Sequence, residues 1–405
     1  MLKFRFSRNY LLLMVIAISN GMVPLLIGST LFVWLKEQGI NIASIGLFGL
    51  ANLPWALSFI ISAVLEYFSY KKYFHYKHVL MIAMLVIATA IYHLPQQIGN
   101  PGLLFKFCLL ISFASSIARV IMLALQKTLF SDQALPLVIN ISTISYKIGI
   151  LFAGSLALYF SQTINWETIY HSFALVFLFS AALIGLFPKR ALNINHSHNQ
   201  LNQSLVTCLL APFKGLYQMP HIVLILLLMF CYRAPDNLIT NYFDLFYLHF
   251  GLSKTNVAFG YKFYGMVVAS LGGLLCIKLN RRYSYYSNLT LALSLHLISY
   301  LLIYWFSNYQ VPLWAFYLCV TLEELTRGMT MIIFWSFQTH ICTRQHILVQ
   351  LALLTAVDSL SYSLLGSVGG IAIHWLGYGN FVLLVLASFI PAFIVLSKLR
   401  KTALL

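Results

Sequence analysis

Apolar runs of about 20 residues recur from one end of the chain to the other. An α-helix of that length crosses the hydrocarbon core of a bilayer, which is about 30 Å thick. Of the 405 residues, 60% are hydrophobic and only 8% are charged, which is too little charge to cover the surface of a water-soluble domain. We therefore predict an all-α polytopic membrane protein.

Polar breaks such as SYKKYFHYKH and PQQIGNPG separate these runs into twelve expected membrane spans. The expected limits are 9–35, 43–68, 77–95, 102–130, 138–161, 166–188, 221–248, 254–279, 285–307, 311–341, 346–376 and 379–398. We expect the first run to be a span rather than a cleaved signal peptide, because it continues to Trp34 with no small-residue cleavage site. The six cysteines stand singly, so we expect no disulfide framework, no metal ion and no cofactor.

The net charge of +16 arises from lysines and arginines at the ends of the apolar runs. They gather before the first span, near residues 72 and 281, in the segment 189–220 and at the C-terminus, whereas the alternate breaks contain almost none apart from Lys36 and Lys254. By the positive-inside rule this pattern places both termini in the cytoplasm, which requires an even number of spans. The charge therefore indicates membrane topology, and we expect no nucleic-acid partner.

Residues 189–220 form the longest segment without an expected span, and they divide the chain into two halves of six spans. We predict an N-terminal half at 1–188, a cytoplasmic linker with an amphipathic segment at 189–220, and a C-terminal half at 221–405. The halves resemble each other weakly, since GINIASIGLFGLANLPWALSF in the second span aligns with GLSKTNVAFGYKFYGMVVASL in the eighth. Two similar halves of the same orientation indicate the parallel repeat of major facilitator transporters, which bind substrate near the membrane midplane between the halves.

Short motifs along nearly the whole chain point to one branch of that superfamily. The motifs are Gly21, Thr30, Leu31 and Trp34 in the first span, Tyr146, Lys147 and Gly149 in the fifth, YRAPD in the seventh, EELTRGM in the tenth and QLALLTA, beginning at Gln350, in the eleventh. Through them the chain resembles the AmpG-type muropeptide permeases. In this alignment Glu323 stands at the family's acidic position in the tenth span, whereas Glu324 and Arg327 replace an asparagine and a glycine.

The resemblance implies a secondary transporter of the inner membrane that imports peptidoglycan-derived muropeptides, driven by the proton gradient. We accordingly expect a small muropeptide-like substrate, protons and the lipid bilayer as partners, a monomer, and no enzymatic activity. One departure concerns the fourth span, where the family carries two aspartates and this chain has Arg119 and Leu123, or Val120 and Ala124 after a shift of one residue. Two alternatives stay open: a permease for siderophores or other small solutes, and a transport-inactive membrane sensor.

Eight charged side chains fall about ten to seventeen residues into their expected spans, near the membrane midplane. They are Arg119, Lys147, Arg233, Asp236, Glu323, Glu324, Arg327 and Asp358. An unpaired charge at that depth costs at least about 2.5–3.5 kcal/mol, so each is expected to face a partner or the interior of the bundle. The set contains as many acids as bases and can therefore pair completely.

The carboxyl groups of this set are candidates for proton coupling, because an acid in a dry cavity can hold a proton near neutral pH. Glu323 and Glu324 are the first candidates, followed by Asp236 and Asp358. The alternative for the two glutamates is a local ion pair with Arg327, three and four residues further along the helix. For Asp236 the alternative is a pair with Arg233, and for Asp358 it is a hydrogen bond between packed helices.

The basic and aromatic residues at the same depth are candidates for substrate binding. They are Arg119, Arg233, Lys147 and Tyr146, together with Gln350. A guanidinium matches a carboxylate bidentately, and an aromatic ring can stack on a sugar. The alternatives are that Arg119 is a structural partner of the tenth-span acids, that Lys147 extends along its own helix, and that Tyr146 is a packing residue. Since the resemblance makes the fourth and tenth spans equivalent helices lining one cavity, Arg119 is expected to face the two glutamates.

Overall fold

The computed structural model of the protein describes residues 8–70, 75–130, 134–187, 221–309, 312–342 and 347–400. All regular secondary structure in these ranges is helical, which confirms the predicted all-α class. The predicted linker at 189–220 falls outside the described residues. The division into two halves of six spans around that linker therefore stays a prediction.

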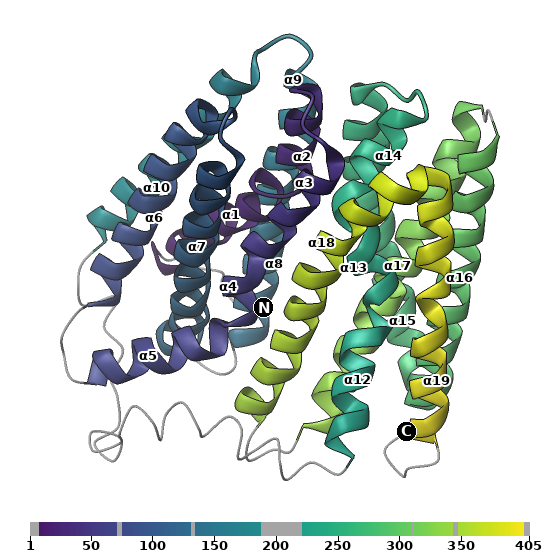
Figure 1. Ribbon diagram of the computed structural model, residues 1–405. Helices are drawn as coiled ribbons and strands as arrows, with labels where there is room; N and C mark the ends of the chain where they lie inside the picture. The colour runs from purple at the N-terminus through teal and green to yellow at the C-terminus, as the bar shows by residue number, and fades with distance from the viewer. Residues whose placement is uncertain are drawn as a thin grey trace. The chain divides into compact units, whose positions relative to one another are not determined.

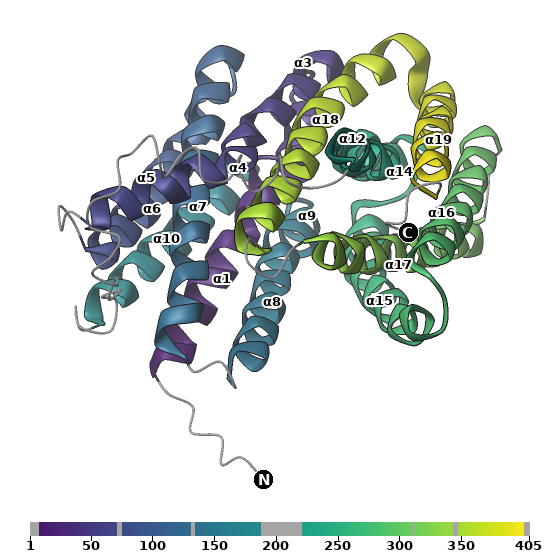
Figure 2. The same ribbon diagram turned by 90° about the horizontal axis from the view of Figure 1, so that it is seen from below.

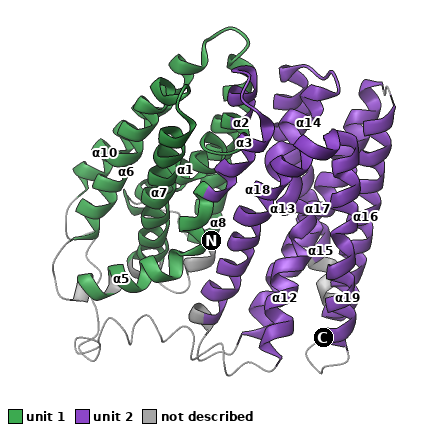
Figure 3. Ribbon diagram, in the orientation of Figure 1, with its two compact units in different colours: residues 1–31, 51–211 green, residues 32–50, 212–405 purple. Residues whose placement is uncertain are grey.

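Contacts between helices divide the chain into two compact units, coloured separately in Figure 3. Unit 1 contains residues 1–31 and 51–211, and unit 2 contains residues 32–50 and 212–405. Residues 32–50 thus group with the second unit, although the residues on both sides of them group with the first. The helices that include residues 32–50 are α2 (Ser29–Glu37), α3 (Ile42–Leu47) and η1 (Phe48–Asn52).

Unit 1 is a bundle of helices in which α1 packs against α8 and α7, and α6 packs against α10. Its helices are α1 (Arg8–Leu26), α4 (Leu53–Ala56), α5 (Ser58–Tyr70), α6 (Tyr76–His93), η2 (Leu94–Gln97), α7 (Pro101–Leu129), α8 (Leu135–Leu151), η3 (Phe152–Leu156), α9 (Ala157–Phe160) and α10 (Trp166–Leu186). Gly21 and Gly149 permit the close crossing of α1 and α8. A Cβ atom on Gly21 would lie 2.0 Å from the carbonyl oxygen of Tyr146, so no larger residue fits there.

Unit 2 is a second bundle, whose first span is bent. Its helices after residue 220 are α12 (Ile222–Tyr232), α13 (Ala234–Ile239), η6 (Thr240–Tyr242), α14 (Phe243–His249), η7 (Asn256–Tyr264), α15 (Gly265–Arg282), α16 (Tyr285–Asn308), α17 (Leu313–Ile341), α18 (Ile347–Ala387) and α19 (Phe389–Arg400). Figure 1 shows α12, α13 and α14 following one another, and the bend between Tyr232 and Ala234 is 42°. Pro235 lies just after the bend, where its missing N–H interrupts the helical hydrogen bonds. Seen end-on in Figure 2, α12 stands between α18 and α19, against which it packs.

The spans found in the described ranges follow the expected ones closely. Nine helical segments there are long and apolar enough to cross a membrane, or ten when the bent pair α12 and α13–α14 counts as one span. Of the remaining expected spans, α17 has 29 residues but carries Glu323, Glu324 and Arg327. The last segment, Gln350–Arg400, has 51 residues and is interrupted at Gly377, whose φ is 73°. That break coincides with the predicted boundary between the eleventh and twelfth spans, while the total of twelve stays a prediction.

The segment 32–50 is held to unit 2 by close backbone packing and by an ion pair. A Cβ atom on Gly46 would lie 2.8 Å from the carbonyl oxygen of Ser367 on α18, so α3 and α18 cross at a glycine contact. At the end of α2, Glu37 Oε1 lies 2.6 Å from Lys254 Nζ. Of the two lysines that stood apart in the topological pattern, Lys254 is a member of this pair and Lys36 lines the same pocket of unit 2.

Candidate functional site

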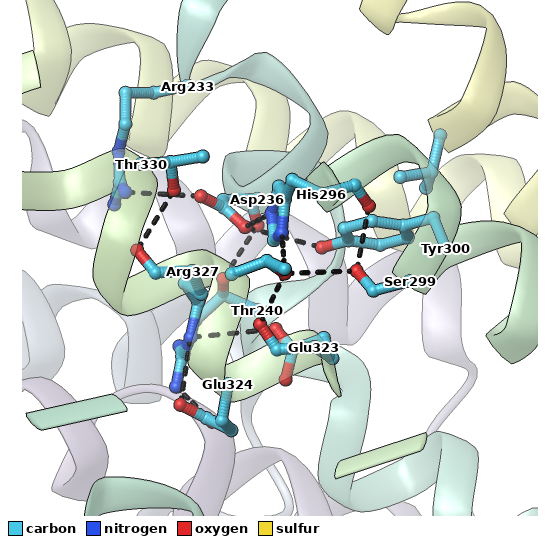
Figure 4. Close-up of polar contacts among 12 residues, drawn as sticks. Arg233, Asp236, Thr240, His296, Ser299, Tyr300, Glu323, Glu324, Arg327 and Thr330 are labelled. Carbon is cyan, nitrogen blue, oxygen red and sulfur yellow. Dashed lines mark hydrogen bonds and ion pairs between the residues drawn. The ribbon is translucent and has the colours of Figure 1, made fainter. Parts of the chain in front are cut away.

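Most of the buried charges that the structure describes in unit 2 lie in one network around α17, which Figure 4 shows in close-up. Arg327 lies three residues after Glu324, and its Nε donates to Glu324 Oε2 at 3.2 Å, while its Nη2 contacts the other oxygen, Oε1. Arg327 Nε also lies 3.5 Å from Glu323 Oε1. One turn of helix thus places a single guanidinium beside two carboxyl groups, as the spacing of three and four residues predicts.

The two adjacent glutamates differ sharply in their surroundings. Glu324 forms the bidentate pair with Arg327, which is a strong geometry for a carboxylate. Glu323 is 0% exposed, and neither of its oxygens has a hydrogen-bond partner within the part of the chain that the structure describes. Among the described residues, Arg327 is therefore the ion-pair partner of Glu323, and this guanidinium is shared with Glu324.

A second part of the network centres on Asp236 at the start of α13. Its Oδ2 lies 3.1 Å from Arg233 Nη1, and its Oδ1 lies 2.8 Å from His296 Nε2 on α16. The hydroxyl of Tyr300 also donates to Oδ1, at 3.3 Å. Arg233 Nε lies 3.8 Å from Asp358 Oδ1 on α18, so this guanidinium stands between two acids as well. The ion pair of Arg233 with Asp236 matches the alternative expected from their spacing.

A separate ion pair joins α14 to the neighbouring helix η7. Lys262 Nζ lies 2.7 Å from Asp244 Oδ2, and their side chains are 8% and 1% exposed. Lys262 belongs to η7, a π-helical segment, and such segments often mark functional positions. Neither residue was among the predicted site residues. Lys262 lies well inside the expected span 254–279, and Asp244 near the end of 221–248, so a full survey of charges in the spans would have found both.

The other predicted residues are placed as follows. In unit 1, Arg119 lies on α7 and is exposed, whereas Tyr146 and Lys147 lie on α8 and are half-buried. In unit 2, Gln350 on α18 is fully buried. The expected approach of Arg119 to the glutamates of α17 involves residues of different units and stays a prediction. Within the described ranges, no three His, Cys, Asp or Glu side chains come together in a way that could hold a metal ion.

The Arg327 guanidinium is expected to be essential for stability because it compensates two buried acids. Arg327→Gln should lower the free energy of unfolding by about 3 kcal/mol, since breaking a buried pair leaves a charge without a partner. The double variant Glu324→Gln/Arg327→Gln removes both members of the bidentate pair and should recover part of that loss, while Glu323 is still left without its guanidinium. Thermal unfolding of the purified protein in detergent measures both effects. Arg8→Gln, at the exposed start of α1, is the control, and equal stability of all three variants would contradict the role of the pair.

Comparisons with known proteins agree with this architecture. Residues 10–366 match the family model of the Major Facilitator Superfamily. A protein named putative transporter AmpG 2 from Rickettsia felis is 32% identical over 401 residues, which cover 98% of this chain and 97% of that protein. The AmpG 2 transporter of Rickettsia bellii is 31% identical, and the match covers 97% of each chain.

Solved structures show the same fold at low sequence identity. A POT family transporter in complex with 5-aminolevulinic acid has a TM-score of 0.77 at 12% identity, covering 99% of this chain and 98% of that one. The nucleoside transporter NupG has a TM-score of 0.70 at 16% identity, covering 97% and 100%. The D-xylose–proton symporter has a TM-score of 0.70 at 14% identity, covering 94% and 96%. The protein therefore belongs to the major facilitator superfamily, in its AmpG branch, and is a multi-pass transporter of the inner membrane.

Proposed function

We propose that the protein imports peptidoglycan-derived muropeptides into the cytoplasm together with protons. The substrate class is supported by the motifs shared with AmpG-type permeases and by full-length relatives that carry the AmpG name. Proton coupling is supported by one observation above all: Glu323 is completely buried, and neither of its oxygens has a hydrogen-bond partner among the described residues. An acid in that position can exchange a proton without breaking a hydrogen bond.

The geometry suggests how a proton on Glu323 changes the network. When Glu323 is neutral, Arg327 can keep both of its hydrogen bonds to Glu324. When Glu323 is ionised, the two carboxylates compete for the same guanidinium, which lies 3.5 Å from Glu323. Binding and release of the proton on Glu323 would thus shift Arg327 between Glu324 and Glu323. Glu324, Asp236 and Asp358 remain further candidates for the coupling acid.

Basic and polar side chains would recognise the anionic peptide and the sugars of the substrate. Arg233 is 17% exposed, and a substrate carboxylate would compete with Asp236 and Asp358 for it. In unit 1, Arg119 offers a second guanidinium, and Lys147 and Tyr146 offer a charge and a ring. Gln350 is fully buried, so it would contact substrate only after a rearrangement of unit 2.

Uptake by proteoliposomes tests the proposed function directly. Purified protein should accumulate radiolabelled N-acetylglucosaminyl-anhydro-N-acetylmuramyl tripeptide when the outside is acidified, and an uncoupler should abolish the accumulation. Uptake of a ferric siderophore in the absence of muropeptide uptake would favour the alternative permease. Muropeptide binding without uptake or proton flux would favour a membrane sensor, an alternative that the absence of both fourth-span aspartates keeps open.

A further inference from the structure

His296 connects the two parts of the buried network, although nothing in its spacing along the chain marks it. Its side chain is 2% exposed. Its Nε2 lies 2.8 Å from Asp236 Oδ1 on α13, and its Nδ1 lies 2.8 Å from Thr326 Oγ1 on α17. Both ring nitrogens of a buried histidine are therefore hydrogen-bonded, to an acid on one side and to a hydroxyl on the other (Figure 4).

The surroundings of the ring satisfy both of its protonation states. In the neutral ring, Nε2–H donates to Asp236 and Nδ1 accepts the hydroxyl proton of Thr326. In the charged ring, Nδ1–H donates to Thr326 Oγ1, and the hydroxyl turns to the carbonyl oxygen of Leu322 at 2.8 Å or of Glu323 at 3.0 Å. The Thr326 hydroxyl has an acceptor in either case. A proton can therefore bind to Nδ1 or leave it, and every polar atom of His296 and Thr326 keeps a hydrogen-bond partner.

The acidic groups of the network outnumber its guanidinium groups, so the network can bind protons. His296 contacts Asp236 on α13, Tyr300 on α16 and the ring of Phe389 on α19. The other charged groups of the network that it joins are Arg233 between α12 and α13, Glu323, Glu324 and Arg327 on α17, and Asp358 on α18. Four carboxyl groups thus face two guanidinium groups. If all were ionised, the cluster would carry two uncompensated negative charges within the membrane span, which is costly. One proton on Glu323 and one on His296 would restore neutrality.

We propose that His296 is a second proton-binding residue of the transport cycle and that its protonation prepares Arg233 to bind the carboxylate of an anionic substrate. This inference rests on the proposed proton coupling. Asp236 is shared, since Arg233 approaches Oδ2 and His296 approaches Oδ1. A charged His296 takes over part of the compensation of Asp236, and Arg233 is then released to form a bidentate pair with substrate. Proton binding and substrate binding are in this way coupled through one aspartate.

A transport measurement tests the role in coupling. His296→Gln keeps a donor toward Asp236 and a partner for Thr326 but cannot take up a proton. It should lower the number of protons moved per muropeptide by one and remove the pH dependence of the half-saturating muropeptide concentration. His171→Gln is the matched control, because that ring stacks on Tyr92 in unit 1, and it should behave as wild type. An unchanged proton ratio and pH profile in His296→Gln would overturn the proposal.

A measurement without substrate separates this inference from the proposed function. In the full-length protein labelled with ¹⁵N-histidine and held in nanodiscs, the signal that disappears in His296→Gln identifies His296. That signal should change from the one-proton to the two-proton form as the pH is lowered. A ring that stays in one form throughout would overturn the inference even if muropeptide uptake is observed. If the ring titrates but muropeptide is not taken up, the proton site stands and the proposed substrate is wrong.

Discussion

Glu323→Gln is expected to reduce the pH-driven accumulation of substrate about tenfold for each unit of the imposed pH gradient, because one coupled proton contributes about 1.36 kcal/mol per pH unit. Glutamine has nearly the same shape as glutamate and leaves the bidentate pair of Glu324 with Arg327 in place. Substrate exchange at equal pH should therefore persist. The measurement is the ratio of internal to external muropeptide in proteoliposomes at several gradients.

Two companion variants show whether the effect belongs to Glu323. Glu37→Gln removes an acid that pairs with Lys254 at the end of α2, outside the α17 network, and it should leave the accumulation ratio unchanged. Glu324→Gln should destabilise the protein, because Arg327 loses its bidentate partner, yet the surviving protein should still accumulate substrate. If Glu324→Gln abolishes coupling and Glu323→Gln does not, the assignment of the coupling acid is reversed.

Gly328→Val is expected to cost about 3 kcal/mol of stability or more, because overpacking at a close helix crossing forces the backbones apart. A Cβ atom at Gly328 would lie 2.0 Å from the carbonyl oxygen of Ala269, and one at Gly272 would lie 2.1 Å from that of Leu325. Helices α15 and α17 therefore touch through glycine on both sides. Thermal unfolding in detergent, together with the yield of monodisperse protein, measures the loss.

The matched control for this crossing is Gly185→Ala in unit 1. A Cβ atom there would meet only the sulfur of Met81, at an ordinary contact distance of 3.5 Å, so the variant should be nearly as stable as the wild type. Equal stability of Gly328→Val and Gly185→Ala would show that α15 and α17 do not cross as closely as described. Because Gly328 lies one residue after Arg327, a shift of α17 would also disturb the buried charges.

Local spacing made part of the site predictable, and tertiary packing determined the rest. The pairs of Arg233 with Asp236 and of Arg327 with the glutamates lie within one helical turn, so their contact follows from helix geometry. His296 meets an aspartate 60 residues away and a threonine 30 residues away, and no periodicity in the sequence marks these partners. Histidine is also easily overlooked in a survey of membrane charges, because its neutral form counts as polar.

The difference between Glu323 and Glu324 illustrates the same limit. The sequence places two identical side chains next to each other and cannot tell which one pairs with Arg327. Successive residues on a helix point about 100° apart, so the neighbours of each carboxyl depend on which helices pack against α17. The fold was easier to predict. The length of each apolar run and the distribution of lysine and arginine can be read from single segments, and neither depends on how the helices pack.

The grouping of residues 32–50 with the second unit has a consequence for protein engineering. A chimera of two related transporters joined within 189–220 would combine α3 from one parent with α18 from the other, at a crossing where a Cβ on Gly370 would lie 2.6 Å from Gly46 Cα. It would also divide the pair of Glu37 and Lys254 between the parents. A chimera that keeps residues 32–50 with the unit they pack in needs two further crossover points between the parents, near residues 31 and 51. The unit that is inherited together is therefore discontinuous in the gene, and a segment of the first half must be exchanged along with the second.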